Sequence, residues 1–151
     1  MTDTFNPDTF LDTDVKADFS DKYVPIPPGR YIATIDEAPP IVRMTKDGPV
    51  VNIKFVIDDP ELTERLNIRN PSAVMSIWPD LESDGSLSVG VNKNVKLGRL
   101  RAALGQNDAK RAWNWNHLRG AGPVLVDVYS QTSDKDPGMV YNKVNRAYPV
   151  S

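Results

Sequence analysis

The sequence predicts a mainly β domain of five short strands, with one helix between the third and fourth strands and an extended acidic arm in front. Three observations lead to this prediction. Several short segments alternate between apolar and polar residues, as half-buried strands do. Proline and glycine residues separate these segments, as they do at turns. One later segment, residues 94–105, instead carries its apolar residues at helical spacing.

The first 24 residues differ from the rest of the chain in charge. They hold six aspartates and two lysines, whereas the whole chain has a formal net charge of −2, so the remainder is slightly positive. Aromatic residues are scattered along this stretch without a regular period. Such a composition is typical of a segment that is flexible alone and becomes ordered by docking. Pro25 to Gly29 then mark a boundary between an arm, residues 1–24, and a domain, residues 25–151.

Three strands are expected before the helix. Residues 30–38 alternate weakly and end at two prolines, and residues 72–78 form the third candidate. The second candidate, within residues 51–58, alternates most clearly, with Val51, Ile53, Phe55 and Ile57 on one face. The segment before it, residues 43–49, is predicted to be a loop that turns at Asp47-Gly48. The cations Arg43 and Lys46 are therefore expected at a loop tip.

The helical segment has recognisable ends. Asn94 is the predicted N-cap and Gly105 the predicted residue after the helix. Its apolar stripe, expected to pack inward, consists of Leu97, Leu100, Ala103 and Leu104. Two more strands follow, residues 123–130 and 139–148, and Val124, Val126 and Val128 share one face of the first. The opposite faces of the strands then present Asn52, Lys54, Tyr129, Tyr141 and Lys143.

Three strands, a helix and two strands is the order of the oligonucleotide-binding (OB) fold, a five-stranded partly open barrel. Four segments also resemble phage-encoded single-stranded DNA-binding proteins with this fold: PPGRYIATIDEA, TKDG followed by a strand ending in DDP, KLGRLRAALG, and LRGAGPVLVDVY. The resemblance covers about residues 25–149. It implies a non-enzymatic protein that coats single strands during replication, recombination or repair in the cytoplasm of a host cell. Such proteins often carry an acidic carboxyl-terminal tail, whereas no acid follows Asp136 here.

Cations and aromatic residues are the expected binding groups, since cations hold phosphates and aromatic rings stack on bases. Residues 92–120 concentrate seven Lys or Arg residues against one acid, but those on the helix do not share one face, so cations on strands are preferred. Trp113 and Trp115 are candidates for base stacking, and closing one end of the barrel is at least as plausible a role. The predicted contacts are Arg43, Lys46, Lys54, Trp78, Lys96, Arg101, Trp113, Trp115, Tyr129, Tyr141, Lys143 and Arg146.

Several function classes are not expected. There is no cysteine, one histidine (His117), no GxxxxGK phosphate loop and no cluster of histidines and carboxylates, so neither catalysis nor a metal or cofactor is predicted. The sequence contains no amino-terminal signal segment and no apolar run of membrane-spanning length, so a cytoplasmic protein without membrane contact is expected.

The sequence therefore predicts a sequence-tolerant single-stranded DNA-binding protein. The acidic arm is expected to compete with DNA for the binding face or to recruit replication or recombination proteins, and a homo-oligomer is possible. The alternative is a structural or protein-interaction module, such as a virion or assembly protein, that uses the same barrel and arm for protein contacts. The choice between DNA and RNA stays open.

Overall fold

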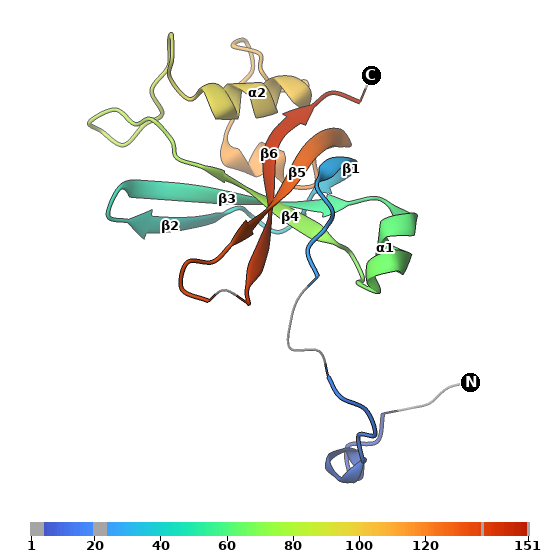
Figure 1. The fold of residues 1–151 in the computed structure, drawn as a ribbon. Coiled ribbons are helices and arrows are strands. Elements are labelled where there is room, and N and C mark those ends of the chain that lie inside the picture. Colours follow the sequence, from blue (N-terminus) through green and yellow to red (C-terminus); the bar gives the residue numbers. More distant parts are fainter. Residues whose placement is uncertain (1–4, 20–23, 137, 151) are drawn as a thin grey trace.

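The computed structural model of the protein describes residues 5–19, 24–136 and 138–150 (Figure 1). The described chain is mainly β, with six strands in one sheet and two α-helices. The strands are β1 (Gly29–Ile35), β2 (Ile41–Thr45), β3 (Gly48–Ile57), β4 (Ser72–Ile77), β5 (Val124–Thr132) and β6 (Val140–Tyr148). The α-helices are α1 (Pro60–Leu66) and α2 (Val95–Ala103), and 3-10 turns span Phe10–Asp12 and Trp115–Leu118.

Only part of the predicted arm is described. Residues 1–4 and 20–23 lie outside the described residues. Residues 5–19 contain one 3-10 turn, where the ring of Phe5 meets the edge of Phe10 at a centroid distance of 4.9 Å. The side chains of this segment are exposed. The prediction that the arm is flexible stays a prediction.

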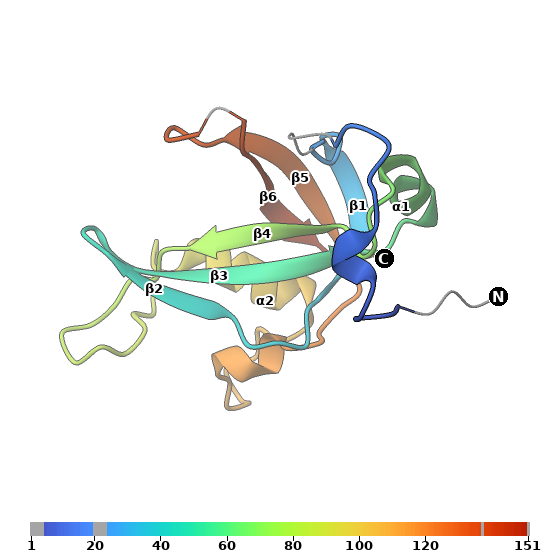
Figure 2. The same ribbon diagram turned by 90° about the horizontal axis from the view of Figure 1, so that it is seen from below.

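Strand pairing links five of the strands in a ring. The sheet order is β1-β5-β6-β4-β3-β2, and β1 also pairs with β3. Every pairing is antiparallel except that of β4 with β6, which is parallel through the pair Val74–Lys143. Figure 2 shows β2, β3 and β4 running side by side, while β1, β5 and β6 curve away from them. Strand β2 extends the sheet beyond the ring.

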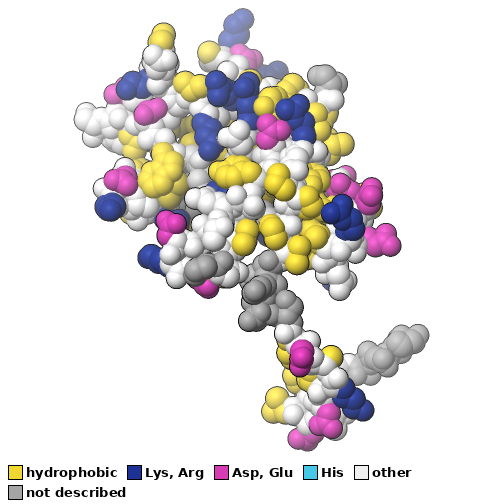
Figure 3. All heavy atoms as spheres, in the orientation of Figure 1, with side chains coloured by type: hydrophobic (Ala, Val, Ile, Leu, Met, Phe, Trp, Pro, Cys, Tyr) yellow, Lys and Arg dark blue, Asp and Glu magenta, His cyan; other side chains and the backbone are white. Residues whose placement is uncertain are grey.

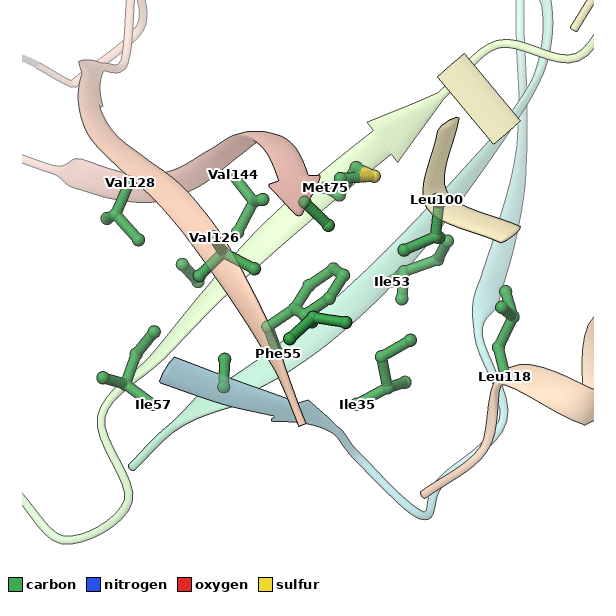
Figure 4. Packing of buried hydrophobic residues seen from close by; sticks show 14 of the residues in the cluster. Ile35, Ile53, Phe55, Ile57, Met75, Leu100, Leu118, Val126, Val128 and Val144 are labelled. Atoms are coloured by element: carbon green, nitrogen blue, oxygen red, sulfur yellow. The ribbon is translucent and has the colours of Figure 1, made fainter. Parts of the chain in front are cut away.

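The buried core confirms the predicted inward faces. Val51, Ile53, Phe55 and Ile57 of β3 are all buried, as are Val124, Val126 and Val128 of β5. Figure 4 shows several of these side chains converging on Phe55. Leu97 and Leu100 of α2 join the same cluster as predicted, and Leu118 of the second 3-10 turn completes it. One face of β3 and one face of β5 are thereby committed to the interior, which leaves the other face of each free for function.

Helix α2 begins and ends where the sequence predicts, although the side chain of the predicted N-cap residue makes other contacts than a cap. Asn94 precedes the helix in a left-handed conformation and makes no side-chain cap. Its side chain instead accepts a hydrogen bond from the Asp80 amide (2.8 Å) and donates to the carbonyl oxygens of Asp80 and Ser88. Gly105 follows the helix with a φ of +72°, a value that favours glycine. These bonds tie the start of α2 to the segment that leaves β4.

Two elements contradict the predictions. Residues 41–45 form β2 instead of a loop, so Arg43 lies opposite Val50 in a strand and only Lys46 occupies the turn. Because the first four residues of β2 are exposed, the segment lacks the apolar alternation that marks a half-buried strand. Asp59 and Pro60 begin helix α1 and do not merely end a strand. The Leu62 amide donates to the Asp59 carboxylate at 3.1 Å, and Pro60 suits the first helical position.

Strand β6 departs from simple alternation. The register between β5 and β6 shifts at Asp127/Val128, which marks a β-bulge. As a result Val144 and Ala147, three residues apart, are both buried, while Asn145 and Arg146 are both exposed. The bulge separates two outward-facing regions of the β5–β6 pair, one around Lys143 and one around Arg146.

Candidate functional site

The outward faces of four neighbouring strands form a continuous polar surface. Alternation places Asn52 and Lys54 of β3 on the side away from the core, opposite Ser76 and Val74 of β4. Across the parallel pairing, Val74 faces Lys143 of β6, and Lys143 faces Tyr129 of β5. The topology thus aligns residues from distant parts of the sequence on one face.

This face is hollowed into a groove. Two cavities, of about 680 and 390 Å³, share Arg43, Ser76, Gln131 and Lys143 in their walls and are therefore adjacent. We refer to them together as the strand groove. Its other lining residues are Ile41, Val50, Asn52, Ser72, Val74, Trp78, Lys96, Tyr129, Val140, Tyr141, Asn142 and Val144. None of these lining residues is an aspartate or a glutamate.

Two lysines in the groove are held by the same serine. The Lys143 ammonium donates to the Ser76 hydroxyl oxygen at 2.7 Å, and the Lys96 ammonium donates to the Ser76 backbone carbonyl oxygen at 2.8 Å. The Ser76 hydroxyl in turn donates to the Asn52 side-chain oxygen at 2.6 Å. Lys96 comes from α2 and Lys143 from β6, so packing of the helix against β6 brings the two charges together.

The electrostatics of the groove favour an anion. Partial burial lowers the pKa of the Lys96 ammonium below its usual 10.5, and the nearby charge of Lys143 lowers it further. Burial likewise lowers the pKa of Lys143, with an additional contribution from Arg43. Among the residues that the structure describes, no acid lies within ion-pairing distance of any of these three cations. Since no described acid pairs with these cations, a bound anion would relieve their mutual repulsion.

Three aromatic side chains lie along the same groove. Trp78 is 51% exposed, Tyr129 41% and Tyr141 50%. Trp78 follows β4, whereas the two tyrosines belong to the facing strands β5 and β6. Figure 3 shows basic side chains (dark blue) gathered near α2, with hydrophobic side chains (yellow) exposed directly below them. Exposed ring faces beside unpaired cations are the groups that bind a flexible strand of bases and phosphates.

The structure places Arg101, Trp113 and Trp115 in a separate cluster. The Arg101 guanidinium lies 4.5 Å from the centre of the Trp113 ring, and the Trp113 indole N–H donates to the Gln106 side-chain oxygen at 2.9 Å. The two tryptophan rings lie 5.6 Å apart and pack against the core. None of the three residues lines the strand groove. Their geometry fits closure of one end of the fold, and their contact with nucleic acid stays a prediction.

The other predicted cations also lie away from the groove lining. Lys46 occupies the β2–β3 turn, and Lys54 lies 3.8 Å from the Asp36 carboxylate. Arg146 lies beyond the bulge, 5.0 Å from the centre of the Tyr148 ring. Beside it the Asp127 carboxylate accepts hydrogen bonds from Arg30 and from the Tyr148 hydroxyl, each at 2.9 Å.

The cluster of Arg30, Asp127, Arg146 and Tyr148 has a structural explanation. Partial burial acts to raise the pKa of the Asp127 carboxyl, but the hydrogen bonds from Arg30 and Tyr148 hold it below its usual value. The charge of Arg146 acts in the same direction, so this cation is partly used in stabilising a carboxylate. The group joins β1, β5 and β6, which are neighbours in the ring.

The sequence prediction omitted Ser76 and Gln131, and it placed Asn52 on the outward face without naming it as a contact. The signal for Ser76 was present, since alternation within Ser72–Ile77 places Ser72, Val74 and Ser76 on one face. The pairings that bring this face beside Lys143 and Lys96 join residues far apart in the sequence, and no local pattern indicates them.

No described helix combines the length and the apolar character needed to cross a membrane. No protein-family model matches the chain, and no curated protein matches it either.

Proposed function

We propose that this protein binds single-stranded DNA along the strand groove with little preference for sequence. The observation that carries the proposal is that Arg43, Lys96 and Lys143 share the groove with Trp78, Tyr129 and Tyr141, with no acid in its lining. The cations would hold phosphates of the strand, and the rings would stack on bases, a contact that every base can make. Duplex DNA keeps its bases stacked inside, so the aromatic residues favour a single strand.

The arrangement of the strands supports an OB-type barrel as the basis of this function. Counted in chain order, the ring strands are β1, β3, β4, β5 and β6, and α2 falls between the third and fourth of them. Proteins of that fold bind oligonucleotides on the second and third strands and on the loops between strands one and two and between four and five. Here the corresponding parts are β3, β4, the connection that carries Arg43, and the base of the β5–β6 hairpin with Tyr141. The resemblance to phage single-stranded DNA-binding proteins implies the same fold and the same kind of ligand.

The direct test is a titration of labelled oligonucleotides, single-stranded and duplex, at two or more salt concentrations. We expect single strands to bind more tightly, with a log–log salt slope of about −0.7 for each phosphate neutralised. Absence of binding at low salt, or a preference for duplex, would contradict the proposal and favour a protein-interaction role for the same face. Parallel titration of RNA of the same sequence settles which nucleic acid is preferred.

Replacing Trp78 by alanine is expected to weaken binding by about 1–3 kcal/mol, because one stacking platform is lost. The slope of affinity against salt concentration should not change, since no charge is removed. Trp78→Phe keeps a flat ring and should retain most of the affinity. Fluorescence anisotropy with a labelled strand measures both quantities. Equal losses for Ala and Phe would show that Trp78 acts through packing and not through stacking.

Binding is expected to depend on pH in the alkaline range. Because the pKa values of Lys96 and Lys143 are lowered, these ammonium groups lose their protons at a lower pH than lysines with the usual pKa of 10.5 do. Affinity should therefore fall as the pH rises toward 10.5. An oligoadenylate probe suits the measurement, since its bases do not titrate there. In the double variant Lys96→Arg, Lys143→Arg the cations stay charged, so its decline with pH should be smaller. An identical decline would assign the effect to other groups.

A further inference from the structure

We infer that Ser76 is the positioning residue of a preorganised oxyanion site, which holds one particular phosphate of the bound strand between Lys96 and Lys143. The inference rests on the proposed function and goes beyond it, because it assigns one anchoring phosphate to one place in the groove. Ser76 itself carries no charge. It acts through the two ammonium groups that it holds on the same wall of the groove.

The hydrogen bonds around Ser76 run in one direction. A lysine ammonium has three donors and no acceptor, so Lys143 must donate to the Ser76 hydroxyl oxygen. The single hydroxyl hydrogen is then directed to the Asn52 side-chain oxygen. The Ser76 carbonyl oxygen accepts from Lys96. This relay turns the acceptor end of Asn52 toward the protein, which leaves its amide NH2 as the end that can face a ligand.

These hydrogen bonds around Ser76 leave several hydrogen-bond donors available to a ligand. Each ammonium uses one donor on Ser76 and keeps two for a ligand, and Arg43 supplies a guanidinium to the same cavities. With no acid among the lining residues, the chemical complement is a group made of acceptor oxygens with negative charge. A phosphate has this composition, and inorganic phosphate and sulfate share it.

Preorganisation is the contribution of Ser76. A free lysine side chain loses rotamer freedom when it binds a phosphate, and that loss weakens binding. Lys96 and Lys143 are already held by Ser76, so much of this ordering takes place when the protein folds. Removing the serine hydroxyl removes the hydrogen bonds that hold the Lys143 ammonium and orient the Asn52 side chain, without altering the number of charges. Affinity should therefore fall while the slope of affinity against salt concentration stays the same, a combination that loss of a cation cannot produce.

The experiment compares Ser76→Ala with two control variants. Ser76→Thr retains the hydroxyl, and Ser130→Ala makes the same chemical change at an exposed residue of β5 that does not line the groove. We expect Ser76→Ala to bind oligonucleotides about three- to tenfold more weakly, the equivalent of one immobilised side chain, with an unchanged salt slope. Ser76→Thr and Ser130→Ala should remain close to the parent protein. Equal loss in Ser130→Ala, or no loss in Ser76→Ala, would overturn the inference.

A second measurement separates this inference from the proposed function. Inorganic phosphate is titrated into the protein alone, and the NMR signals of the lysine ε-CH2 groups are followed at constant ionic strength. Signals of Lys96 and Lys143 should shift in the parent protein, and in Ser76→Ala the same shifts should require a higher phosphate concentration. If no variant binds oligonucleotides but these shifts occur, the proposed function fails and the oxyanion site stands. If oligonucleotides bind and inorganic phosphate shifts neither lysine, the oxyanion site is wrong.

Discussion

Replacing Lys96 and Lys143 together by alanine is expected to weaken the binding of single-stranded DNA about a hundredfold at moderate salt. Hydrogen bonds to charged groups contribute about 1.5–3 kcal/mol each, so the loss of two costs about 3 kcal/mol at the lower end of this range, or roughly a hundredfold in affinity. The two ammonium groups are the cations that the fold orients most firmly, since both donate to Ser76. The salt slope should become shallower by about 0.7 for each phosphate no longer neutralised.

The matched control replaces Lys93 and Lys110 by alanine. Both of these lysines are exposed, and neither lines the strand groove. The control removes the same formal charge, so it reports how much affinity depends on the general charge of the protein. We expect it to weaken binding only a few-fold at low salt, because solvent and ions screen exposed charges. If both double variants lose affinity equally, the strand groove is not the binding surface.

Alternation and residue type predict most of the fold. The predicted inward faces of β3 and β5 are confirmed. One face of each of these strands is buried, and burial imposes a period of two on the sequence. Strand β2 was not predicted, because burial does not constrain the residue types along it. It is held by its pairing with β3 and by the tight turn at Lys46-Asp47, which leaves no apolar pattern to detect. Asp59 and Pro60 carried a signal for helix α1 that a turn also explains.

The candidate site is predictable only in part, since it depends on which strands are neighbours. Tyr129 and Lys143 belong to the outward face in both the prediction and the structure, and the structure adds that they face each other across β5 and β6. The basic residues within 92–120 do not form one cluster in the structure. Lys96 reaches the groove, whereas Arg101 turns toward Trp113. Charge density along the sequence does not reveal this division, because helix geometry and packing determine the direction of each side chain.

The groove is also only as stable as the core beneath it. Most of its lining residues on β3, β4, β5 and β6 are neighbours in sequence of buried residues, and two of them, Val50 and Val144, are buried themselves, so the two faces fold together. Phe55 belongs to the most deeply buried group, with no exposed surface, and it comes from the strand that joins β1 to β4 within the ring. Replacing Phe55 would therefore change the stability of the site but not the chemical groups that line it.

Replacing Phe55 by alanine is therefore expected to lower the free energy of unfolding by about 3–5 kcal/mol, through lost burial and the cavity left behind. Domains of this size are commonly stable by about 5–15 kcal/mol, so the variant should still fold at low temperature and melt well below the parent protein. Chemical denaturation followed by circular dichroism measures the difference. Phe10→Ala makes the same change at a residue that is 57% exposed, and it should alter stability by no more than about 0.5 kcal/mol. Folded Phe55→Ala protein should bind DNA nearly as tightly as the parent, because its groove residues are intact. A comparable loss of stability in Phe10→Ala would show that the amino-terminal segment packs on the domain and contributes to the folded state.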